Sequence, residues 1–245
     1  FGIALGADGT AWVTALGGAS VVAIDPATGE TRATVETGGW PSEIAIGADG
    51  TAWVADTGGR TLLIDTASAT VTGEIAGGDY PTGVALDPAG GRAWVTFTGQ
   101  ETPSTLVGVL DRATMSIATE IEVAPGPIDV ALSPDGATLA VASLVGNAVT
   151  LIDPATGTVR TTLALEGGPR NLAFSPDGGT LYVTLKEAGA LQAIDVANGT
   201  LGAAVALGGL VYGVAVTADG ATIAVTTGTE TTGHEWDGKI GRAHV

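Results

Sequence analysis

The sequence predicts an all-β protein, a β-propeller of four-stranded antiparallel blades. Three observations carry this prediction: a composition rich in glycine, two turn motifs that recur in step, and short apolar runs between those turns. The 245 residues include 39 glycines, about twice ordinary usage, whereas charged residues make up only 14%. This bias suits many tight turns between short buried strands and argues against a helical bundle.

The first recurring motif is a small glycine turn, which reads Asp-Gly in five of its six copies. Its glycines follow one another at intervals of 40 to 46 residues. They are Gly9, Gly50, Gly90, Gly136, Gly178 and Gly220. Because Asp-Gly favours positive φ angles, we expect each copy to close a two-residue hairpin between the first and second strand of a repeat.

The second motif reads Asp-Pro-Ala-Thr-Gly in its fullest copies and keeps phase with the first. Its aspartates are Asp25, Asp65, Asp111, Asp153 and Asp195. Such an aspartate can accept hydrogen bonds from the backbone of its own turn, and the glycine supplies a left-handed position. We therefore interpret both motifs as turn structure and not as catalytic or calcium-binding sites. The formal acceptor Asn198-Gly199-Thr200 is interpreted in the same way, as a type I′ turn.

Each repeat is expected to hold four strands, which in the fourth copy span residues 128–132, 138–142, 148–152 and 159–165. A four-stranded unit of about 40–45 residues repeated side by side is the pattern of a propeller blade. The sixth copy reaches only its second strand, at residues 221–226. We expect about five and a half blades and, because propellers close with about four to eight, an incomplete ring.

The expected domain covers residues 1–239 and is truncated at both ends. The chain opens on Phe1, directly inside the repeat pattern, so we expect a fragment of a longer reading frame. Residues 240–245 read IGRAHV, which matches a translated sequencing adaptor, and are predicted to be a non-native tail outside the fold.

Several functional classes lack support. The chain has no cysteine and two histidines, so we expect neither a metal site nor a cofactor. Nine basic residues without a run argue against nucleic acid. Residues 201–218 are uncharged, but their glycines and repeat phase predict two strands and a turn, and no membrane span. Residues 233–239 match a phosphate loop without its Ser/Thr, and His234 within them is interpreted as a loop residue.

Two segments carry a resemblance to a known family. Residues 174–184 (FSPDGGTLYVT) and 149–159 (VTLIDPATGTV) resemble the YVTN-type β-propeller repeat. The Trp-Val pairs that begin at Trp12, Trp53 and Trp94 are more distantly similar to NHL and streptogramin-lyase propellers. The resemblance implies a non-enzymatic binding protein, extracellular, on the cell surface or periplasmic. The alternative is a streptogramin-lyase-like or lactonase-like enzyme whose catalytic residues lie largely in missing blades.

Ligand-binding residues are expected on the variable loops, opposite the uniform turns, because binding groups tend to lie on loops held by a rigid scaffold. The candidates around the expected channel mouth are Trp40, Glu43, Tyr80, Asp129, Arg170, Asn171 and Tyr212. The loops between second and third strands add Asp56, Arg60, the long loop 97–105, Asn147, Lys186 and Glu187.

Aromatic side chains beside mixed polar groups suit a small molecule, a glycan or a protein segment. In the alternative interpretation, Trp40 and Tyr80, each followed by a proline, only cap the blade packing. The formal charge of −17 raises solubility, repels anionic surfaces and is compatible with an extracellular protein.

Overall fold

The computed structural model describes residues 2–228 and 239–243 and confirms the all-β prediction. Apart from one 3-10 turn, η1 (Leu16–Gly18), the regular elements in these ranges are strands. They pair into five four-stranded antiparallel sheets and one three-stranded sheet. The chain divides into two compact units, residues 1–122 (unit 1) and 123–245 (unit 2), each of which is described by itself.

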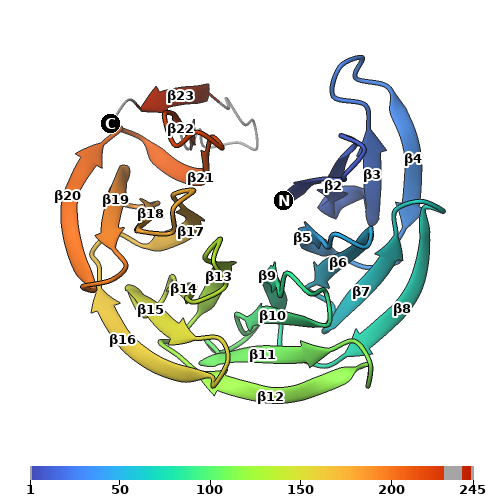
Figure 1. Ribbon diagram of the computed structural model, residues 1–245, viewed down its shortest axis with the longest axis horizontal. Coiled ribbons are helices and arrows are strands. Elements are labelled where there is room, and N and C mark those ends of the chain that lie inside the picture. Colours follow the sequence, from blue (N-terminus) through green and yellow to red (C-terminus); the bar gives the residue numbers. More distant parts are fainter. Residues whose placement is uncertain (1, 229–238, 244–245) are drawn as a thin grey trace. The chain divides into compact units, whose positions relative to one another are not determined.

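Unit 1 contains three blades, each a meander in which sequential strands are neighbours (Figure 1). Blade 1 consists of β1 (Ile3–Leu5), β2 (Ala11–Ala15), β3 (Ser20–Ile24) and β4 (Thr31–Glu36). Blade 2 consists of β5 (Pro41–Ile46), β6 (Thr51–Asp56), β7 (Arg60–Asp65) and β8 (Thr70–Ala76). Blade 3 consists of β9 (Pro81–Leu86), β10 (Arg92–Phe97), β11 (Leu106–Asp111) and β12 (Ser116–Glu122).

Unit 2 contains two further four-stranded blades and the three-stranded sheet. Blade 4 consists of β13 (Pro127–Leu132), β14 (Leu139–Ser143), β15 (Ala148–Asp153) and β16 (Thr158–Ala164). Blade 5 consists of β17 (Pro169–Phe174), β18 (Thr180–Leu185), β19 (Ala190–Asp195) and β20 (Thr200–Ala206). Blade 6 consists of β21 (Leu210–Val216), β22 (Ile223–Gly228) and β23 (Lys239–Ala243).

The predicted strand limits of blade 4 agree with the structure to within one residue, and the expected long loop runs from the end of β10 to the start of β11. Residues 240–243, part of the segment that the sequence predicts to be a non-native tail, lie in β23, which pairs antiparallel with β22 from Ile223 to Thr227. An open strand edge presents backbone donors and acceptors that a neighbouring segment can pair with whatever its sequence.

The Asp-Gly turns also differ from the expected two-residue hairpin. At the first copy only Gly9 has a positive φ, 79°. Its N–H donates to the carbonyl of Gly6 at 2.9 Å, and the N–H of Thr10 donates to the Asp8 carboxylate at 3.0 Å. The turn is therefore one residue longer than expected, because the Asp side chain holds the backbone in a turn with a single left-handed position.

The type I′ interpretation of Asn198-Gly199 is wrong for a similar reason. Gly199 has a positive φ of 60°, whereas Asn198 is not among the residues with positive φ. The N–H of Gly199 donates to the carbonyl of Asp195 at 2.9 Å, and the N–H of Asn198 donates to the Asp195 carboxylate at 2.9 Å. The aspartate that opens the motif therefore sets the turn, as expected for its other copies.

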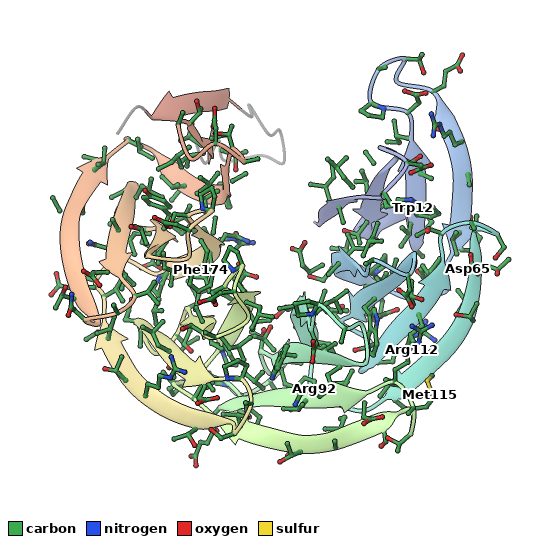
Figure 2. All side chains as sticks on the ribbon, viewed as in Figure 1. Trp12, Asp65, Arg92, Arg112, Met115 and Phe174 are labelled. Atoms are coloured by element: carbon green, nitrogen blue, oxygen red, sulfur yellow. The ribbon has the colours of Figure 1, made fainter. Side chains whose placement is uncertain are left out.

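The hydrophobic core lies between consecutive blades within each unit. Trp12, Trp53 and Trp94 on the second strands keep 3%, 1% and 1% of their surface exposed. Trp12 belongs to the cluster between blades 1 and 2, and Phe174 packs at the edge of the cluster between blades 4 and 5 (Figure 2). The fourth strands are mostly exposed, and β20 is exposed along its whole length. First strands of neighbouring blades within a unit lie against one another, as β5 and β9 do.

A threonine at one position of the second strand joins neighbouring blades. In blade 1 the Thr14 hydroxyl accepts the N–H of Gly2 at 2.7 Å and donates to the carbonyl of Ser42, in β5, at 2.6 Å. Thr184 makes the equivalent pair of bonds between blades 5 and 6. These hydroxyls are buried, so each bridge satisfies backbone groups that water does not reach.

Candidate functional site

The structure offers two candidate sites on the variable loops, one in each unit. In unit 1 an open pocket of about 490 Å³ lies beside the ends of β6 and β7. Its lining residues come from three loops and from β6, β7 and β8, and they are Ala19, Gly38, Gly39, Trp40, Asp56, Gly58, Gly59, Arg60 and Glu74. We call this set the Trp40 pocket.

An ion pair between buried Asp56 and half-buried Arg60 forms the polar part of the Trp40 pocket. Asp56, at the end of β6, is fully buried, and its Oδ2 accepts both Nε and Nη2 of Arg60 at 3.2 Å. Its Oδ1 accepts the backbone N–H groups of Trp40 and Gly58 at 3.0 and 2.9 Å. Arg60 also reaches Glu74 at 3.0 Å. Arg60 Nη2 also donates to the carbonyl of Thr37 at 2.7 Å, so all three guanidinium nitrogens have an acceptor and hold the loops together.

Trp40 has the opposite exposure from the other tryptophans that the structure describes. Its side chain keeps 60% of its surface exposed, while its backbone is held by Asp56 and by the N–H of Thr57, which donates to the Trp40 carbonyl at 3.0 Å. A rigid backbone thus presents a large aromatic side chain to solvent at the edge of the pocket. The structure therefore does not bury Trp40 as a cap between blades.

Tyr80 stands apart from the Trp40 pocket and does not line it. It has a φ of 60°, which is uncommon for a residue with a side chain, and its carbonyl accepts the N–H of Thr98 at 3.2 Å. The neighbouring Asp79 accepts the N–H groups of Gly99 and Gln100, so this turn anchors the long loop between β10 and β11. Tyr80 is half-buried beside that loop.

In unit 2 the structure brings three of the predicted residues together. The guanidinium of Arg170, in β17, lies 5.3 Å from the ring centroid of Tyr212, in β21. Lys186, just after β18, places its ammonium 5.7 Å from the same centroid. All three side chains are half-buried. Burial lowers the pKa of Arg170 from its ordinary value, while Tyr212 and Asp129 act in the opposite direction. We call Arg170, Lys186 and Tyr212 the cation cluster.

Asp129 and Asn171 lie beside the cation cluster and bind each other. Asp129 Oδ2 accepts the backbone N–H of Leu172 at 2.9 Å and the side-chain amide of Asn171 at 3.3 Å, and its Oδ1 accepts the N–H of Val130 at 2.8 Å. Burial raises the pKa of Asp129 to about 6, against the hydrogen bonds and the charge of Arg170, which lower it. The carboxylate thus joins blades 4 and 5.

The position of Asp129 has a structural explanation in the threonine bridges. Asp129 pairs with Ala142 in β14, where blades 1 and 5 have a bridging threonine. Blade 4 thus combines an alanine at the threonine position with an acidic residue on the first strand. Blade 2 has the same combination: Ala55 replaces the threonine, and Glu43 Oε1 accepts the N–H of Ile44 at 3.4 Å. In the two blades that lack the hydroxyl, an acidic side chain on the first strand bonds to the backbone there.

The candidates on the loops between second and third strands also divide into turn residues and exposed residues. Asn147 has a φ of 46°, and its side chain accepts the N–H of Gly168 at 3.0 Å, which makes it part of a turn. Glu187 is exposed next to Lys186. His234 lies outside the residues that the structure describes, and within those residues no three histidine, cysteine or acidic side chains group as metal ligands would. Among the described elements, none is a helix long and apolar enough to cross a bilayer.

Sequence reasoning missed two features of these sites, Glu74 and the threonine bridges. Glu74 lies on the fourth strand, away from the variable loops, yet it lines the pocket and binds Arg60. The bridges had a visible signal, since a threonine follows the Trp-Val or Tyr-Val pair at Thr14, Thr96 and Thr184.

Comparison with known proteins supports the fold and leaves the family open. No family model matches the chain, and no curated protein matches its sequence. Solved structures match in large numbers, 1681 chains, as expected for an architecture that many unrelated proteins share. One is "Kuenenia stuttgartiensis Hydrazine Synthase", 24% identical, with a TM-score of 0.83 over 92% of this chain and 75% of that one. At this identity the likeness shows the fold alone: the chain is a β-propeller of four-stranded blades.

Proposed function

We propose that this propeller is a non-enzymatic, YVTN-type binding module, secreted or on the cell surface, that takes a small polar molecule or glycan in the Trp40 pocket. The observation that carries the proposal is the exposure of Trp40, 60%, on a backbone fixed by the fully buried carboxylate of Asp56. A large aromatic face beside a few fixed polar groups is the usual composition of such sites. The neighbouring Glu74, whose side chain is 46% exposed, supplies carboxylate acceptors at the pocket edge.

The state of the carboxylates supports binding over catalysis. Both oxygens of Asp56 are occupied by the Arg60 guanidinium and by backbone N–H groups. Asp129, the carboxyl with the raised pKa, likewise accepts three N–H donors. A general acid or base must reach the ligand's proton directly or through one water, and neither carboxylate has an oxygen without a protein donor.

The test is a screen of the full chain against immobilised glycans and small polar compounds, followed by titration of each hit. Trp40→Ala should weaken binding about tenfold or more, since stacking on an aromatic ring contributes on the order of 1–3 kcal/mol in related contacts. Val71→Ala is the matched control, because Val71 is also an exposed apolar residue of unit 1, 42% exposed, and lies outside the pocket.

Two results would contradict the proposal. If Trp40→Ala and Val71→Ala bind the ligand equally well, the Trp40 pocket is not the binding site. Chemical conversion of a bound hit by the wild-type chain, followed by mass spectrometry, would favour the lyase-like or lactonase-like alternative.

A further inference from the structure

Charge pairing in this protein has an exception at the cation cluster. The structure describes seven cationic side chains, and five of them form ion pairs with carboxylates. The five paired residues are Arg32, Arg60, Arg92, Arg112 and Arg160. Arg170 and Lys186 are the two without a carboxylate at ion-pairing distance among the described residues, although the chain carries 26 acidic residues.

These two cations lie against the same aromatic ring, that of Tyr212. Within residues 2–228 their side-chain nitrogens have no hydrogen-bond acceptor, and both residues are half-buried. Two like charges held near one ring repel each other, and partial burial weakens the solvation of each charge. Within the described part of the chain, neither residue has a fully buried nitrogen without a partner, so both cations remain accessible to an anion from solvent. Cation–π contact offsets only part of this cost.

The nearest acid cannot take the role of that acceptor. Asp129 acts on Arg170 through its charge, but its oxygens are directed at the N–H groups of Leu172 and Val130 and at the amide of Asn171. The guanidinium is a planar fork that matches the two oxygens of a carboxylate or phosphate. The formal charge of −17 opposes polyanions, so the occupant that fits best is a small molecule with one acidic group.

We propose that Arg170, Lys186 and Tyr212 form a binding site for a small oxyanion-bearing ligand, a sugar acid or a sugar phosphate. Arg170 binds the oxyanion in bidentate fashion, Lys186 supplies the second charge, and Tyr212 keeps both cations in place. The inference rests on the proposed function in placing ligands on the variable loops. It uses no residue of the Trp40 pocket, so either site can fail while the other stands.

The experiment titrates the full chain with three probes that differ only in the acidic group: D-glucuronate, D-glucose 6-phosphate and D-glucose. Binding is followed by isothermal titration calorimetry at low ionic strength. At least one of the two acids should bind saturably, and glucose should not. The acid that binds with the higher affinity shows whether the site prefers a carboxylate or a phosphate. Binding should weaken as salt is added, because the contact is ionic.

Variants locate the site. Arg170→Gln and Lys186→Gln should each weaken binding of the acid about tenfold or more, since a charge-assisted hydrogen bond is lost. Arg160→Gln is the matched control: it removes the same charge from unit 2, but Arg160 is paired with Asp153 at 3.5 Å and lies outside the cluster. Trp40→Ala should bind the acid as wild type does. Melting curves of every variant verify that the chain is folded.

Three results would overturn the inference: no binding of either acid, equal binding of glucose, or a loss in Arg160→Gln that matches the loss in Arg170→Gln. If Arg170→Gln fails to fold, Lys186→Gln alone tests the site. Lys186 lies just after β18, and its bonds to neighbouring segments come from its backbone, so this variant should fold.

Discussion

The raised pKa of Asp129 predicts that this one carboxyl makes the protein less stable as the pH rises. Burial raises its pKa from 3.8 to about 6 in the folded chain. A raised carboxyl pKa means that the folded state favours the protonated form, so the contribution is fully present below about pH 4 and is lost as the pH passes through about 6. The difference of about 2.2 units corresponds to about 3 kcal/mol, an upper limit because Asp129 keeps some contact with water.

The assay is urea unfolding of the wild type and of Asp129→Asn between pH 4 and pH 8, since Asn keeps the shape and one acceptor oxygen but does not titrate. The comparison is needed because most turn aspartates, such as Asp8 and Asp153, have lowered pKa values and lose stability in the opposite direction, as the pH falls. The unfolding free energy of the wild type minus that of the variant should fall by up to about 3 kcal/mol from pH 4 to pH 8. Parallel pH profiles would refute the reasoning, and so would a difference that grows with pH.

Three further changes test the packing of the blades. Thr184→Val should cost about 1–3 kcal/mol of unfolding free energy in urea, because the carbonyl of Tyr212 loses its buried donor; a loss no larger than that of an exposed threonine would contradict the bridge. Asp56→Ala should cost about 3–5 kcal/mol by the same measurement, because Arg60 is left half-buried with its main partner gone; a near-neutral effect would show that the pair is solvated. Gly157→Ala should lower the melting temperature, with a cost of about 1 kcal/mol, because its φ is 70°; an unchanged melt would mean that the turn relaxes.

The repeat made the fold predictable from the sequence, because two motifs in phase fix both the length of the unit and the position of its turns. The finer turn geometry was not predictable from Asp-Gly alone. A free dipeptide favours two left-handed residues, whereas here the Asp8 carboxylate holds the N–H of Thr10 and leaves only Gly9 left-handed. Local side-chain hydrogen bonding thus decides between two turns of nearly equal sequence preference.

The candidate site was predictable in part. Arg170 and Tyr212 were expected on loops on the same side of neighbouring blades; they lie near the starts of the first strands β17 and β21, and they do meet. Glu43 and Asp129 appeared as ligand candidates because acids on variable loops suggest binding. When the blades are aligned, however, Glu43 and Asp129 both lie in blades whose second strand has alanine at the position of the bridging threonine. Recognising that exchange requires the register between strands, which the structure supplies.

The strong acidity of the chain is largely explained by its turns. Eleven aspartates, one in nearly every recurring turn, each accept a backbone N–H two or three residues ahead. They are Asp8, Asp25, Asp49, Asp65, Asp87, Asp111, Asp135, Asp153, Asp177, Asp195 and Asp219.

Asparagine could form the same bond, but an ionised acceptor bonds about twice as strongly, which favours aspartate at each repeat. Without these eleven charges the formal charge would be −17 + 11 = −6, an ordinary value for a domain of this size. The net charge therefore reflects the number of repeated turns and carries little independent information about location. Arg170 and Lys186, which have no ion-pair partner among the residues that the structure describes, are more informative about function, because no turn requires them and they lie together against Tyr212 in a strongly acidic chain.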